Sequence, residues 1–176
     1  RTNIPHLYVC GELASSGIMG ANRLASNSLI ECLVFGKRAV EDSVRNRRED
    51  PIPETIPSFS LDREKLDAYL SLKNKVADIM TQEAGIIRTA NGLQEGLENL
   101  LRLEQTEIFE ENEYYSLVSK NLLTVAELII RSALFRKESR GGHFRSDYPT
   151  PNDDYVCHII QQKGKEIKTT PVILNN

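Results

Sequence analysis

The stretch "TANGLQEGLENLLRLEQTEIFEENEYYSLVSKNLL" (residues 89–123) decides the fold, because it holds two helical patterns and the break between them. Leucines in its first half recur at the spacing of one face of an α-helix. Thr89 is a suitable N-cap for this helix. The acidic break "TEIFEENE" suits the N-terminal end of the next helix, where the helix dipole favours negative charge. The stretch therefore predicts two helices joined by a short connection.

No proline occurs from Asp62 to Phe135, and three apolar stripes at helical spacing lie in this range. Gly85 lies in the first break between them. Short connections make neighbouring helices antiparallel, so we expect an up-down-up three-helix bundle over residues 62–140. Its core is expected to comprise Leu66, Tyr69, Leu70, Val76 and Met80; Leu93, Leu97, Leu100 and Leu101; and Tyr115, Val118, Leu122, Val125 and Ile129.

Two segments flank the predicted bundle. Residues 49–61 contain Pro51, Pro53 and Pro57, and proline fixes the backbone angle and removes a donor, so this segment is predicted to be an extended linker and a domain boundary. Residues 141–176 begin with a polar loop and end with "YVCHIIQQKGKEIKTTPVIL", which predicts a β-hairpin that turns at Lys163 and Gly164.

Residues 1–48 predict a strand, a loop and a helix. "LYVCG" (7–11) is a short apolar run ended by glycine, typical of a buried strand. "SLIE" (28–31) has the form of a capping box, which predicts a helix from Ser28 to about Val44. One face of this helix carries Leu29, Leu33, Gly36 and Val40, and Gly36 is expected to allow a close neighbour.

The composition excludes several classes of protein. The chain has 176 residues, 27% of them charged, with a net charge of −3, and no apolar run approaches the roughly 20 residues of a spanning helix. Neither nucleic acid nor a membrane is therefore an expected partner. The three cysteines are far apart and form neither a disulfide framework nor a metal-ligand spacing, which fits a reducing cytosol. The three histidines form no ligand pattern either. A start at Arg1, without Met or signal peptide, suggests a fragment.

The chemistry concentrates in residues 11–31. A helix N-terminus presents unpaired N–H groups and partial positive charge, which stabilise an electron-rich group. Arg23 precedes this helix and can bind a carboxylate through two parallel N–H bonds. Glu12, at a strand end, is placed like the acidic residue that accepts from ribose hydroxyls. Each feature alone also has a simpler interpretation. The helix start can be an ordinary capped helix, Arg23 a surface residue and Glu12 an ordinary hydrogen-bonding residue.

Together these residues form a recognisable string. "LYVCGELASSGIMGANRLASNSLIECLVFGKRA" (7–39) resembles the flavin-binding motif near the C-terminus of the L-aspartate oxidase family and of its relatives, the flavoprotein subunits of succinate dehydrogenase and fumarate reductase. "ESRGGHFRSDYP" (138–149) resembles the second signature of that superfamily. The resemblance implies a mainly α fold: the last strand and helix of an α/β FAD-binding domain (1–48), the linker (49–61), the bundle (62–140) and the hairpin tail (141–176).

The resemblance also implies roles for four residues. Glu12 would hydrogen-bond the adenosine ribose of FAD, and the backbone at Ser28 and Leu29 would face the N1–C2=O edge of the flavin. Arg23 would bind a carboxylate of the dicarboxylate substrate. The family's Gly-rich phosphate loop and its proton-handling arginine are not in this sequence, so no catalytic residue and no metal ligand is assigned. The chain alone is expected to be inactive.

The implied reaction is oxidation of L-aspartate to iminoaspartate by hydride transfer to FAD in the cytoplasm. Oxygen or fumarate would reoxidise the flavin, and the product would feed quinolinate and hence NAD synthesis, with quinolinate synthase as a possible partner. Ala25-Ser26, Glu31-Cys32 and "GGHFRSDYP" are similar to the oxidase branch. The alternatives are a respiratory succinate dehydrogenase or fumarate reductase subunit, and a helical docking module without chemistry.

Three residues of the second signature have alternative roles. Arg140 and Arg145 either brace the tail against the flavin domain or form surface salt bridges. His143 is expected to be a packed or hydrogen-bonding residue, because the family places the proton transfer elsewhere and a general base must lie within reach of the reacting proton.

Overall fold

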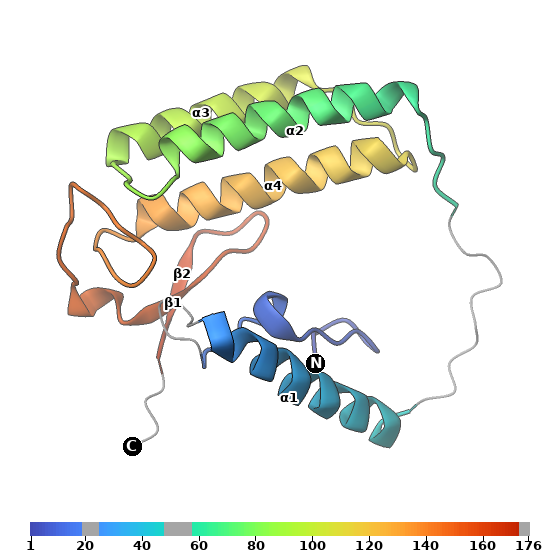
Figure 1. Ribbon diagram of the computed structural model, residues 1–176, viewed down its shortest axis with the longest axis vertical. Coiled ribbons are helices and arrows are strands. Elements are labelled where there is room, and N and C mark those ends of the chain that lie inside the picture. The colour runs from blue at the N-terminus through green and yellow to red at the C-terminus, as the bar shows by residue number, and fades with distance from the viewer. Residues whose placement is uncertain (19–24, 48–57, 173–176) are drawn as a thin grey trace. The chain divides into compact units, whose positions relative to one another are not determined.

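A computed structural model describes residues 1–18, 25–47 and 58–172 of a mainly helical chain (Figure 1). The chain divides into two compact units, Arg1–Ile56 and Pro57–Asn176. Unit 1 contains the 3₁₀ helix η1 (Gly11–Ala14) and the helix α1 (Ala25–Arg45). The elements of unit 2 are α2 (Glu64–Glu83), α3 (Ala90–Thr106), α4 (Tyr114–Phe135), η2 (Asp153–Tyr155), β1 (Cys157–Ile160) and β2 (Lys168–Pro171). Most of the predicted linker lies outside the described residues.

The predicted three-helix bundle is confirmed, since α2, α3 and α4 all pack on one another. The helices approach closely at Gly96, where a Cβ would lie 2.9 Å from Glu83 Cβ and 3.1 Å from Ile130 Cδ1. The buried core comprises Leu72, Val76, Ala84, Leu93, Leu97, Leu100, Leu123, Ala126, Ile130 and Ala133. Val76 and the α3 leucines 93, 97 and 100 were predicted from their helical spacing.

Two side-chain caps fix where the helices begin. Thr89 Oγ1 accepts from the N–H of Gly92 at 3.0 Å, which confirms the predicted N-cap of α3. At α4 the carboxylate of Glu113 accepts from the N–H groups of Tyr115 and Ser116, at 3.0 and 2.6 Å. Burial opposes the charge on Glu113, but these hydrogen bonds outweigh it and lower its pKa. The acidic break thus caps the third bundle helix, as expected.

The stripe predicted for α4 is wrong by one position along the helix. Val125 and Ile129, expected in the core, are 54% and 44% exposed. Apolar residues lie around most of this helix, so the hydrophobic pattern does not determine which face is buried. The buried face carries several small side chains, which let α2 and α3 approach closely. The buried positions are Ser116, Ser119, Leu123, Ala126, Ile130 and Ala133. On α2, Leu70 is likewise exposed and Leu72 is buried.

Unit 1 departs from the sequence prediction in three ways. Residues 7–10 form no strand, because no described segment pairs with them and Leu7 is bonded in a local turn to Thr2 and Ile4. The helix α1 begins at Ala25, three residues before the predicted Ser28. No described atom lies within 4 Å of the position that a Cβ would take at Gly36, so Gly36 mediates no close approach there.

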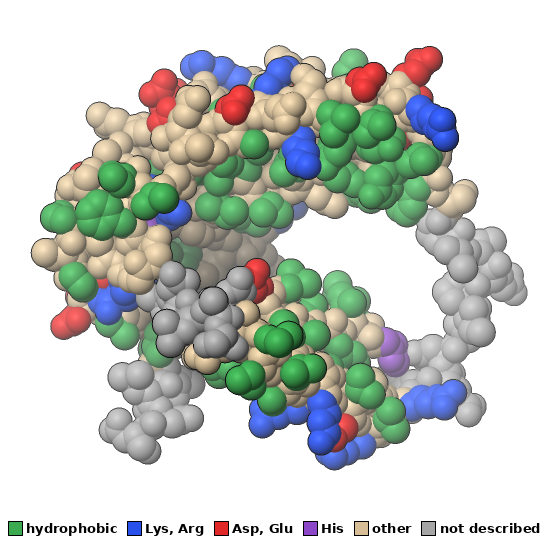
Figure 2. All heavy atoms as spheres, in the orientation of Figure 1, with side chains coloured by type: hydrophobic (Ala, Val, Ile, Leu, Met, Phe, Trp, Pro, Cys, Tyr) green, Lys and Arg blue, Asp and Glu red, His purple; other side chains and the backbone are tan. Residues whose placement is uncertain are grey.

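The apolar face predicted for α1 is largely exposed within unit 1. Leu29, Leu33 and Val40 are 68%, 67% and 63% exposed. Figure 2 shows hydrophobic side chains on the surface of this helix. Among the described elements of unit 1, η1 alone packs on α1, and a single short 3₁₀ helix covers little of a helix of 21 residues.

The predicted hairpin is confirmed. Strands β1 and β2 pair antiparallel, with Cys157 opposite Pro171 and Ile160 opposite Lys168. The chain reverses through a turn in which the N–H of Lys165 donates to the carbonyl of Gln162 at 3.0 Å. Gly164 has a φ of +73°, a value that glycine adopts without steric cost. The hairpin therefore turns at the predicted Lys163–Gly164 step.

Candidate functional site

The segment expected to contact a flavin is built on α1. Gly11 begins η1 with a φ of +71°, and a Cβ there would lie 2.9 Å from Cys32 Sγ. A larger residue at position 11 would therefore meet both backbone strain and a clash with α1. Glycine at this position lets η1 lie directly on the helix.

A buried carboxylate fastens the following loop to the same helix. Glu31 is only 4% exposed and accepts a hydrogen bond from the Ser16 hydroxyl. Because α1 begins at Ala25, Ser28 lies within the helix, and "SLIE" does not stand at the helix start as a capping box does. Ser16 has no sequence signature that would have identified this role.

The predicted site residues fall at different places. Glu12 is exposed in η1, Ser28 is half-buried in the N-terminal part of α1, and Leu29 beside it is 68% exposed. Arg23 lies outside the described residues. With α1 beginning at Ala25, the N–H groups that lack an intrahelical acceptor precede Ser28 and include that of Asn27. The contacts predicted for these residues with flavin and substrate stay predictions.

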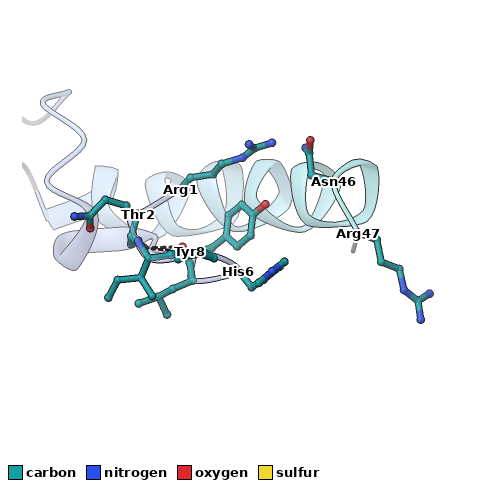
Figure 3. A pocket seen from close by; sticks show the side chains of 10 residues that line it. Arg1, Thr2, His6, Tyr8, Asn46 and Arg47 are labelled. Atoms are coloured by element: carbon teal, nitrogen blue, oxygen red, sulfur yellow. Dashed lines mark hydrogen bonds between the residues drawn. The ribbon is translucent and has the colours of Figure 1, made fainter. Parts of the chain in front are cut away.

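A separate cavity of about 430 Å³ lies at the opposite, C-terminal end of α1 (Figure 3). Residues 1–8 line it together with Asn46 and Arg47. Arg1 pairs with Asp42, and Tyr8 donates to Asp42 at 2.9 Å. The bond from Arg1 is the main reason that the pKa of Asp42 is lowered to about 2. This cavity contains none of the predicted flavin-binding residues.

In unit 2 a single buried carboxylate organises the second signature. Glu138 is fully buried and accepts from Arg136 and Arg140. It also accepts from the N–H of Asn152 at 2.8 Å. Burial opposes the charge on Glu138, but the bonds from Arg140, Asn152 and Arg136 outweigh it and hold its pKa at about 2. Arg136 in turn donates to the carbonyls of residues 155 and 157, so α4, the loop and the start of β1 are joined.

Arg145 is buried, so the expectation of a surface salt bridge is wrong for this residue. It is 1% exposed and donates to Asp147 through Nε and Nη2, at 2.8 and 2.6 Å, and to the carbonyl of Ala133 at 2.9 Å. The bond from Arg145 is the main cause of a pKa of about 2 at Asp147. Asp147 also accepts from the N–H of Ala90, at the start of α3. Arg145 therefore braces the loop within unit 2.

His143 is a hydrogen-bonding residue, as predicted. Its Nδ1 lies 3.0 Å from Nη1 of Arg88, and its Nε2 lies 3.1 Å from the carbonyl oxygen of Arg136. An arginine only donates, so Nδ1 accepts and Nε2 carries the hydrogen. Burial, and to a lesser extent the nearby arginines, lowers the pKa of His143. The contribution of Arg88 was missed, since nothing in "GIIRTAN" sets this arginine apart.

The described residues contain no group of three or more His, Cys, Asp and Glu side chains that would hold a metal ion. None of the described helices is both long and apolar enough to cross a membrane. The three cysteines, Cys10, Cys32 and Cys157, are free thiols.

Comparison with known proteins gives consistent results. The model of the family "Fumarate reductase flavoprotein C-term" matches residues 73–176. The L-aspartate oxidase of Nostoc sp. is 37% identical over 93% of this chain and 33% of its own length. That of Acinetobacter baylyi is 36% identical over 98% of this chain and 33% of its own length. The chain thus spans about a third of the length of the curated relatives that it matches.

Solved structures agree with this result. A quinol fumarate reductase of E. coli has a TM-score of 0.71 and 25% identity, covering 97% of this chain and 34% of its own. The Sdh1 complex of Mycobacterium smegmatis has a TM-score of 0.65 and 27% identity, covering 94% and 32%. The two signatures, the bundle between them and these matches agree, and the chain belongs to the flavoprotein superfamily of succinate dehydrogenase, fumarate reductase and L-aspartate oxidase.

Proposed function

We propose that this chain is the C-terminal part of an FAD-dependent enzyme that oxidises L-aspartate to iminoaspartate. The main support is the similarity to proteins named L-aspartate oxidase over nearly the whole chain. FAD, when bound, would accept the hydride that leaves the substrate. In this chain the roles are binding and orientation, because the sequence contains neither a Gly-rich phosphate loop nor an assigned catalytic residue.

The residues of unit 1 fit part of a flavin nucleotide. Glu12 presents an exposed carboxylate, which accepts hydrogen bonds from ribose hydroxyls. The N-terminal turn of α1 supplies N–H groups and partial positive charge, with Ser28 and Leu29 at its end. Leu29 and Ile30 expose apolar surface, 68% and 61% of each residue, suited to a flat ring. We propose that this turn faces the N1–C2=O edge, where the reduced flavin carries negative charge.

Arg23 is the proposed substrate-binding residue. A guanidinium group binds a carboxylate with two parallel N–H bonds and so fixes both the position and the rotation of a dicarboxylate. Such a clamp would hold the substrate for hydride transfer. The reaction would be the first step of NAD biosynthesis through quinolinate, in the cytoplasm. Oxygen or fumarate would be the electron acceptor, and quinolinate synthase would be a partner.

Two other functions are alternatives to L-aspartate oxidation. The fold similarity to a quinol fumarate reductase favours a respiratory flavoprotein subunit as the second candidate. A docking module without chemistry would describe the 176-residue chain by itself, and we expect this chain alone to bind FAD weakly and to show no turnover. Tight stoichiometric FAD binding by the isolated chain, measured by flavin fluorescence, would contradict that expectation.

The deciding experiment uses the complete flavoprotein that contains this chain. The oxidised protein is mixed anaerobically with L-aspartate or with succinate, and the flavin absorbance is followed. Bleaching by L-aspartate alone supports the oxidase, whereas bleaching by succinate alone assigns the protein to the respiratory branch. Arg23→Leu should weaken L-aspartate binding about 10- to 100-fold. Arg38→Leu, an exposed arginine within α1, is the matched control and should leave binding unchanged.

A further inference from the structure

A groove of about 400 Å³ on unit 2 combines an apolar wall with two arginines. Its wall is the side of α4 that is not buried in the bundle, and Val125 and Ile129 are about half exposed there. The residues at its far side come from the α2–α3 turn, the second signature and β1. The described lining comprises Arg88, Val125, Leu128, Ile129, Ser132, Ala133, Arg136, His143 and Ile159.

Arg88 is the polar group of this groove that lacks a charged partner. Its Nε donates to the carbonyls of Ala84 and Gly85, at 3.1 and 2.8 Å, and its Nη1 donates to His143. No acceptor within the described parts of the chain bonds its Nη2, and no carboxylate there forms an ion pair with it. Burial lowers the pKa of the guanidinium, as expected for a cation removed from water without a counter-ion.

The surrounding charges do not neutralise Arg88. Glu138 is shared by Arg136 and Arg140, and Asp147 is bound by Arg145. Asp153 also acts on Arg140, so four guanidinium groups and three carboxylates leave an excess of one positive charge in this cluster. None of the described residues that line the groove is acidic. The groove therefore presents positive charge beside exposed apolar surface. A bound anion would offset the free-energy cost of removing the Arg88 guanidinium from water.

We propose that this groove binds an organic anion made of a carboxylate and an apolar body. The carboxylate bonds the free edge of the Arg88 guanidinium, and the body lies on Val125, Leu128 and Ile129. A charge-assisted bond to a planar guanidinium gives orientation, and the apolar wall gives most of the buried area. The inference does not depend on the proposed flavin chemistry, because every residue that carries it belongs to unit 2.

The first test titrates octanoate into the 176-residue chain and follows ¹H–¹⁵N NMR shifts. Octan-1-ol is the uncharged match of the same length. We expect saturable shifts at Arg88, His143 and Val125, and binding of octanol about tenfold weaker or worse, because it lacks the charge-assisted bond. Equal affinity for the two compounds, or no saturable shift with octanoate, would overturn the proposal.

The second test changes the apolar wall at Val125 and, in a separate variant, removes the Arg88 guanidinium. Val125→Asp puts a carboxylate into the groove at a half-exposed position and should abolish octanoate binding, while Val125→Asn should weaken it much less. Leu117→Asp, an exposed position on α4 that does not line the groove, is the control and should bind normally. Arg88→Met should lose about tenfold in affinity, against no change for the exposed Arg102→Met. Unchanged binding by Val125→Asp overturns the proposal even where Arg88→Met fails to fold.

Discussion

Arg145 and Asp147, two residues apart in the second signature, form a two-bond ion pair in which the arginine is 1% exposed and the distances are 2.8 and 2.6 Å. The third bond of Arg145, to the carbonyl of Ala133, ties this pair to the C-terminal part of α4. A buried guanidinium that satisfies both a carboxylate and a helix carbonyl is costly to remove, because each partner is left unpaired.

We therefore expect Arg145→Met to lower the free energy of unfolding by about 3 kcal/mol or more. Urea unfolding followed by circular dichroism measures this. The exposed Arg102→Met, which removes only an i,i+4 surface pair, should change it by less than about 0.5 kcal/mol. Equal losses for the two variants would show that the buried pair contributes no more than a surface one.

The carboxylates of Glu138 and Asp147 should make unit 2 sensitive to acid. Both have a pKa of about 2 in the folded chain, below the values near 4 of an unfolded chain. Their stabilisation is therefore complete above about pH 4 and is lost as the pH falls toward 2. Unfolding measured between pH 5 and pH 2 should show this loss, and Glu138→Gln should flatten it. Glu104→Gln, an exposed change on α3, controls for the loss of one carboxylate.

Adjacent isoleucines on α4 test which face is buried. Ile130 is fully buried and Ile129 is 44% exposed. Ile130→Ala should cost about 2–5 kcal/mol of unfolding free energy, because it leaves a cavity between the helices. Ile129→Ala should cost much less. The reverse order would mean that the stripe predicted from sequence, with Ile129 inside, is the correct one.

Removing the N-cap of α3 should change the stability less than removing Ile130. Thr89→Ala removes the acceptor for the N–H of Gly92 and should cost about 1 kcal/mol, seen as a lower midpoint in thermal unfolding. Thr81→Ala, on α2, removes only a bond to the carbonyl of Ala77 within the helix and should cost clearly less. A Thr81 effect as large as that of Thr89 would contradict a capping role.

Two helical glycines should respond in opposite directions to alanine. At Gly96 a new Cβ meets Glu83 and Ile130, so Gly96→Ala should destabilise the bundle by about 1–3 kcal/mol. At Gly36 no described atom lies within 4 Å of the new Cβ, so Gly36→Ala should add about 0.5–1 kcal/mol of helix stability. Helix content on heating, followed by circular dichroism, compares the two variants with the parent chain.

The bundle could be predicted because its signals are local. Helical spacing, the absence of proline and the caps at Thr89 and in the acidic break all act within one or two turns. The buried face of α4 could not be predicted, because small residues such as Ser119 and Ala126 allow close packing there although larger apolar residues lie on the other faces. The strand at residues 7–11 failed for a related reason: an apolar run indicates burial, whereas a strand also needs a partner.

The candidate site was predicted only in part. The two signatures were found from their letters, and His143 was correctly interpreted from the role that such a residue usually has. The sequence does not predict that Glu138 accepts hydrogen bonds from both Arg136 and Arg140, because the spacing of these three residues does not indicate which of them is buried. Arg88 lies 55 residues from His143, and only the folded chain brings the two together.

Two main-chain hydrogen bonds join the α2–α3 turn to the second signature, beside the side-chain bonds of Arg88 and Asp147. The N–H of Arg88 donates to the carbonyl of Phe144, and the carbonyl of Arg88 accepts from the N–H of Ser146, at 3.1 and 2.9 Å. Such bonds do not depend on which side chains occupy positions 144 and 146. Mutations can therefore accumulate at these two positions during divergence while the junction keeps its shape, and relatives with different letters in this motif can retain the same architecture.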